Sequence, residues 1–79
     1  MTLRNLCEQL RPDVKVMAEF GKEREYREYV DTTAGAVLEL EPGQYADCDL
    51  ISWEFAPSGF KSGKLVFSLY ARLYGTIIG

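Results

Sequence analysis

Residues 50–74 read LISWEFAPSGFKSGKLVFSLYARLY, and this stretch largely determines the fold because apolar and polar side chains alternate along two long runs. In the second run one face is wholly apolar, with Leu65, Phe67, Leu69, Ala71 and Leu73. The first run repeats the pattern with Ile51, Trp53 and Phe55. A period of two is that of a β-strand with one buried face.

Residues 57–63, PSGFKSG, separate the two runs and consist of residue types that favour turns. The stretch therefore predicts an antiparallel hairpin with a loop at its tip. Burial of its apolar face, at roughly 1.5 to 3 kcal/mol per large side chain, is expected to supply most of the core stability.

The N-terminal segment predicts a short helix. Thr2 is a good N-cap, and apolar residues follow at the spacing of an amphipathic helix: Leu3, Leu6, Cys7 and Leu10. Pro12 ends this helix. So short a helix is unstable alone, so we expect its apolar stripe to pack on the sheet.

The middle of the chain is less uniform. Residues 14–20 alternate as a strand, and Gly21-Lys22 suits a two-residue turn. Residues 23–31 fit a strand or a helix, and their β-favouring end favours the strand. Residues 37–40 fit a short strand or a helical turn equally well. In the apolar tail, Ile77 and Ile78 are expected to pack back onto the domain.

These patterns predict one α+β domain over residues 1–79: a short N-terminal helix packed on an antiparallel sheet of four to five strands. A chain of 79 residues allows one domain with a small core. With 47% hydrophobic and 27% charged residues, its composition is that of a globular protein.

Cysteine usage and hydropathy bear on location. Cys7 and Cys48 lack the spacing of a metal site and predict reduced thiols. The N-terminus has no apolar signal core, and no run approaches the roughly twenty apolar residues of a membrane span. The expected location is the cytoplasm, with no membrane partner.

The chain contains no histidine, which removes the commonest general acid and base and the commonest metal ligand. Asp47 with Asp49, and Glu39 with Glu41, lie two residues apart, which is typical of a solvated strand face. No phosphate-binding glycine motif and no calcium loop occurs. We expect no enzyme, no cofactor and no metal site.

Acidic residues are concentrated in the middle of the chain. Between Arg27 and Lys61 the sequence has seven acids and no base: Glu28, Asp31, Glu39, Glu41, Asp47, Asp49 and Glu54. Such a region either keeps the protein in solution or steers it onto a basic protein surface. With a pI near 4.8 the chain lacks the charge that direct nucleic-acid binding needs.

Aromatic residues suggest a second surface. Tyr70, Arg72 and Tyr74 lie on the face of the last strand opposite the core, and Tyr with Arg is typical of binding hot spots. Phe60 is expected at the hairpin tip. These side chains are either covered by the domain itself or available to a partner, including a second copy of the chain.

The segment Thr2 to Leu10, followed by Pro12 to Val16, resembles the start of many small accessory proteins of bacteriophages and mobile elements. Such proteins commonly have a short capped helix that leads into an antiparallel strand. The resemblance implies the cytoplasm of a host cell and inhibition of host machinery, as anti-CRISPR proteins do. It assigns no functional residue.

The sequence thus predicts a non-enzymatic protein-binding module, an inhibitor that covers a basic nucleic-acid-binding surface of a host defence protein such as a CRISPR-Cas effector. The expected binding residues are Glu39, Glu41, Asp47, Asp49, Glu54, Phe60, Tyr70, Arg72 and Tyr74. The alternative is a structural subunit that forms a homo-oligomer through the outer face of the last strand.

Overall fold

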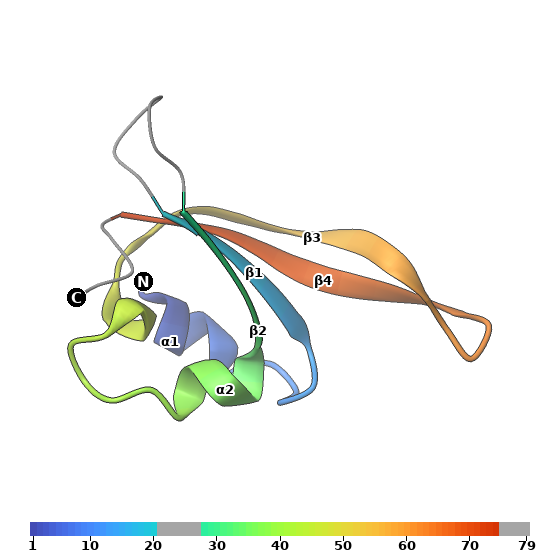
Figure 1. Cartoon of the computed structure of the whole chain (residues 1–79), viewed down its shortest axis with the longest axis horizontal. Helices are drawn as coiled ribbons and strands as arrows, with labels where there is room; N and C mark the ends of the chain where they lie inside the picture. The colour runs from blue at the N-terminus through green and yellow to red at the C-terminus, as the bar shows by residue number, and fades with distance from the viewer. Residues whose placement is uncertain (21–27, 75–79) are drawn as a thin grey trace.

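The computed structural model describes residues 1–20 and 28–74, in which four strands form one sheet (Figure 1). They are β1 (Lys15–Phe20), β2 (Glu28–Thr33), β3 (Leu50–Lys61) and β4 (Lys64–Leu73), in the spatial order β2–β1–β4–β3. The α+β class and the four strands are as predicted.

The sheet is mixed, and in this it differs from the expected antiparallel sheet. β1 pairs antiparallel with β2 and β3 with β4, but the central pair β1–β4 is parallel. Alternation of side chains does not encode strand direction. The long stretch of chain between β1 and β4 supplies the crossover that a parallel pair requires.

The two segments whose sequence fits either a strand or a helix have defined structures where the structure describes them. The favoured strand over residues 23–31 is present from Glu28 as β2, and its first part, residues 23–27, lies outside the described residues. Of residues 37–40, Val37 and Leu38 belong to a helix, α2 (Ala34–Leu38). The turn expected at Gly21-Lys22 and the packing of Ile77 and Ile78 lie outside the described residues.

Helix α1 (Leu3–Cys7) has the predicted cap. Thr2 Oγ1 accepts a hydrogen bond from the Asn5 N–H at 3.2 Å, and Asn5 Oδ1 accepts one from the Thr2 N–H at 3.1 Å. Thr33 caps α2 through the Ala36 N–H. Both helices and the 3₁₀ turn η2 (Tyr45–Asp47) lie on one face of the sheet and form the helical layer (Figure 1).

The core lies between the helical layer and the sheet. The sheet contributes Val16, Ala18, Phe20, Leu69, Ala71 and Leu73, and the helical layer Leu3, Leu6, Cys7, Ala34, Val37 and Ala46. The two cysteines are free thiols, Cys7 fully buried and Cys48 partly buried, in agreement with the expected reduced state.

The β3–β4 hairpin is longer than predicted. Its strands continue through the expected loop to Lys61 and Lys64, leaving Ser62 and Gly63 as a two-residue turn. Both turn residues have positive φ, 52° and 75°, which suits the twist of a tight hairpin. The register slips at Ile51 and at Ser58, where β3 bulges.

The hairpin extends beyond the helical layer, as Figure 1 shows. We call residues 53–67 the arm; its tip is the Ser62-Gly63 turn, and its root is the end beside the helical layer. The prediction that the whole hairpin face is buried is wrong, since Ile51, Trp53, Phe55, Leu65 and Phe67 are all exposed. Only the Leu69, Ala71 and Leu73 part of β4 lies under the helices.

Element length explains why the arm is uncovered. Helices α1 and α2 have five residues each, or about 8 Å of helix. Strand β3 has twelve residues, or about 40 Å of strand. A helical layer this short covers one end of the hairpin and leaves the other without a second layer.

Candidate functional site

The exposed apolar side of the arm is the main surface feature of the molecule. Register places its side chains together, because β3 residues pair directly with β4 residues of the core-facing side: Trp53 with Ala71, Phe55 with Leu69, Pro57 with Phe67 and Phe60 with Leu65. The large exposed members, which we call the arm face, are Trp53 (44% exposed), Phe55 (47%), Phe60 (78%), Leu65 (45%) and Phe67 (50%).

The arm face continues the core along the same side of the sheet. Leu65 and Phe67 share the side of β4 that carries the buried Leu69, Ala71 and Leu73. Its residue types are those of a protein interior, and none of the five is charged. The arm face therefore has the composition of a core layer but no covering layer within the described chain.

The middle of the arm is held in shape by two serines on the opposite side. Ser68, which is buried, donates a hydrogen bond from Oγ to Ser58 Oγ at 2.7 Å, and Ser58 Oγ donates to the Val66 carbonyl at 3.3 Å. These bonds join the bulged residue of β3 to β4. They fix the local geometry that presents Phe55 and Phe67.

The arm face exposes a large aromatic surface to water. An aromatic side chain has roughly 200 Å² to bury, so the exposed fractions of the four aromatic rings of the arm face leave on the order of 450 Å² in water. The largest apolar patch on a typical monomer is about 300 to 600 Å² and is often functional.

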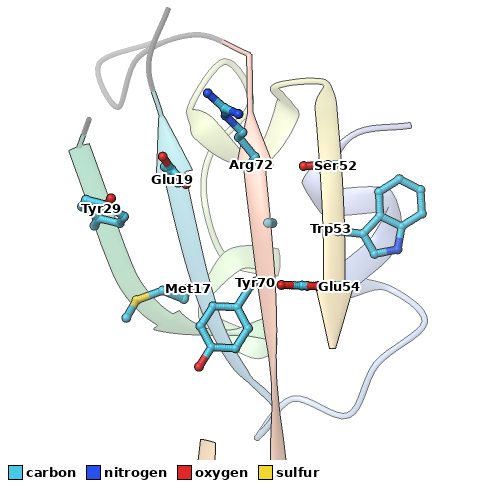
Figure 2. A pocket seen from close by; sticks show the side chains of 9 residues that line it. Met17, Glu19, Tyr29, Ser52, Trp53, Glu54, Tyr70 and Arg72 are labelled. Carbon is cyan, nitrogen blue, oxygen red and sulfur yellow. The ribbon is translucent and has the colours of Figure 1, made fainter. Parts of the chain in front are cut away.

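The other side of the sheet carries a shallow hollow of about 400 Å³. Figure 2 shows Tyr70 and Arg72 of β4 there, between side chains of β1 and β3: Met17, Glu19, Ser52 and Glu54. Three predicted binding residues, Glu54, Tyr70 and Arg72, thus come together. Their mixed charges and open setting suit a polar contact surface.

The acidic segment does not form one surface. Glu54 lies on the hollow side of the sheet, directly opposite Tyr70, whereas Glu39 and Glu41 are exposed in the segment that follows α2. Asp49 is exposed just before β3.

Asp47 is engaged within the domain. Its carboxylate accepts a hydrogen bond from Arg4 Nε at 2.8 Å and another from the Gly43 N–H at 3.0 Å. The bond from Arg4 and then that from Gly43 hold the pKa of Asp47 below its ordinary value. Arg4 thus places a positive charge beside the acidic segment between Arg27 and Lys61, which contains no basic residue of its own.

The two remaining predicted residues lie apart from the hollow. Phe60 lies in β3 near the arm tip, paired with Leu65, and Tyr74 is exposed just beyond β4. Sequence reasoning assigned Trp53, Phe55, Leu65 and Phe67 to the core and so missed the arm face. The signal that could have found them is the mismatch in length between the ten-residue strand run at 64–73, about 33 Å long, and a nine-residue helix, about 14 Å long.

Three further findings bear on the class of protein. Within residues 1–20 and 28–74, no cluster of acidic, cysteine or histidine side chains could hold a metal ion. No helix in this part of the chain has the length and hydropathy to cross a membrane. Comparison with protein-family models, curated proteins and solved structures found no match to this chain.

Proposed function

We propose that the protein is a non-enzymatic protein-binding module that acts by packing the arm face against another protein surface. The observation that carries this is the row of five uncovered apolar side chains on the core side of the sheet. Contiguous exposed patches of this kind mark interaction sites. Because a two-stranded hairpin is only marginally stable in water, a protein packed on the arm face would also stabilise the arm itself.

Photo-crosslinking tests this function for a protein partner of any identity. A benzophenone-bearing phenylalanine analogue replaces Phe60 on the arm or, as a matched control, Tyr29, which is 60% exposed on the hollow side. Irradiation in cells is expected to give protein adducts from position 60 and not from position 29. Absence of adducts from position 60 would contradict the proposal.

A second candidate function uses charge: inhibition of a nucleic-acid-handling protein, such as a CRISPR-Cas effector, by covering its basic surface. The exposed Glu39 and Glu41 support it, because they place two negative charges close together just after α2, where a basic surface could meet them without contacting the arm. Asp47 is unsuited to test it, since its carboxylate also accepts hydrogen bonds from Arg4 and Gly43 within the domain.

Charge reversal at matched places tests the second candidate. Glu39→Lys with Glu41→Lys is compared with Glu8→Lys with Asp13→Lys, which changes net charge equally at other exposed positions. A tagged protein is used to capture defence complexes from a bacterial lysate at low and moderate salt. Salt-sensitive capture that is lost only in the first variant is expected; equal capture by both variants would exclude this mechanism.

A further inference from the structure

We infer that the partner of the arm face is a second copy of this chain, with the two arms packed face to face and antiparallel about a two-fold axis. This inference rests on the proposed function, in that it takes the arm face as the protein-binding surface. A two-fold interface uses the same patch on both copies, so each side chain must meet a chemically similar surface. The arm face meets that condition, because it is uniformly apolar.

The exposed area matches what a stable dimer needs. A standard interface buries about 800 Å² on each partner, and in homodimers about 65% of that area is apolar. That requirement is about 520 Å² of apolar surface per copy, and the exposed aromatic rings of one arm face, at on the order of 450 Å², supply most of it. Two packed sheets about 10 Å apart would bury it as a core.

The edge of the arm is less suited to association than its face. β3 is an edge strand, but Pro57 lacks the N–H that an added strand would use, and the bulges at Ile51 and Ser58 interrupt the row of backbone groups. These features block a continuous ladder along β3. Packing through the arm face requires no such ladder.

Charge sets the direction of the two arms. Lys61 and Lys64 lie directly opposite each other at the tip, whereas Glu54 lies at the root and Asp49 and Arg72 lie in the domain just beyond it. A parallel dimer would bring four lysines together at one end. An antiparallel dimer places each basic tip near the acidic root of the other arm.

Sedimentation equilibrium of the purified chain tests whether a second copy of the chain binds the arm face. From about 10 to about 500 µM, the mass is expected to rise from 9.0 kDa to twice that value. Phe55→Ser with Phe67→Ser is expected to weaken the dimer at least about 100-fold. The matched control, Tyr29→Ser with Tyr74→Ser, removes two exposed aromatic rings away from the arm face and is expected to leave it unchanged.

Circular dichroism establishes that each variant is folded, which is expected because all four altered residues are exposed. A wild type that stays at 9.0 kDa throughout would overturn the inference. A dimer lost only in the tyrosine variant would also overturn it and place the interface on the outer side of the sheet. Adducts from position 60 to a different protein, with a monomeric wild type, would leave the proposed function intact and remove this inference alone.

Spin labels at the tip test the direction. Ser62→Cys is labelled in a Cys48→Ser background, where Cys7 is buried from the reagent. Antiparallel arms place the two tips on the order of 30 Å apart, the length of the exposed part of the arm. A tip-to-tip distance below about 15 Å would show parallel arms and overturn the antiparallel arrangement.

Discussion

Arg4 is the residue that joins the separate pieces of the helical layer. From α1 its guanidinium donates to the Leu38 carbonyl at 3.2 Å, to the Leu40 carbonyl at 2.8 Å and to the carboxylate of Asp47. It therefore ties α1 to the end of α2 and to η2. A planar group with five fixed donors suits this role, and lysine would not replace it.

Replacing Arg4 with alanine should lower the thermal midpoint by several degrees, because two carbonyls and one carboxylate lose their donor together. Arg11→Ala, at an exposed position beyond α1, is the control and should leave the midpoint unchanged. Thermal unfolding followed by circular dichroism measures both. Equal midpoints for the two variants would contradict the role given to Arg4.

Cys7 gives the fold a dependence on alkaline pH. Burial raises the pKa of its thiol from 9.0 to about 11. Because the folded-state pKa is the higher one, its stabilising contribution is complete below about pH 9 and is lost as pH rises toward 11. Burial also raises the pKa of Tyr45 and Cys48, in the same direction.

The free energy of unfolding should therefore fall more steeply above pH 9 in the wild type than in Cys7→Ala. Urea unfolding at several pH values gives the two slopes. Slopes, rather than absolute values, are compared because the variant also loses packing in the core. Parallel slopes would show that Cys7 does not carry the effect.

At the scale of the elements, β4 changes from core strand to arm strand along its length. Leu69→Ala should cost about 2 to 5 kcal/mol in the monomer, because it empties a fully buried position. Leu65→Ala, four residues earlier on the same side of the strand, should cost less than about 0.5 kcal/mol. Urea unfolding at low micromolar concentration measures both. Similar costs would mean that the arm face is already covered within one chain.

The elements that could be predicted depend on local pattern. The capped helix at Thr2 and the alternation along residues 14–20 and 64–73 are set by neighbouring residues, so the sequence alone indicates them. Strand direction, and how much of the sheet the helices cover, depend on how elements distant in sequence pack together. Alternation on β4 is identical for Leu65 and Leu69, yet only the second lies under a helix.

The predicted binding residues also differ in whether local pattern or distant contacts decide where they lie. Phe60 could be placed near the tip because turn-favouring residues surround it in the sequence, although β3 continues through it to Lys61. Asp47 is predicted to be part of an acidic surface because the sequence does not reveal its hydrogen bond with Arg4, which lies forty-three positions away in the chain. Long-range pairs of this kind are decided by tertiary packing and not by charge pattern.

The whole molecule combines a two-layered body with a single-layered arm. The body buries its apolar residues between sheet and helices, whereas the arm places five large apolar side chains in water. Association through the arm completes the second layer, so we expect the arm to gain most of its stability when it is covered. In such a dimer the exposed acids Glu39 and Glu41 of the body would be present on both copies, so under the second candidate function two copies could contact one basic surface together.

Trp53 reports on whether a second copy of the chain covers the arm face. It is the only tryptophan in the sequence and lies on the arm face, 44% exposed. Its fluorescence emission should move to shorter wavelength, and its quenching by iodide should decrease, as protein concentration rises through the dimerisation range. Emission and quenching that stay those of an exposed indole while sedimentation shows a dimer would contradict cover of the arm face by the second copy.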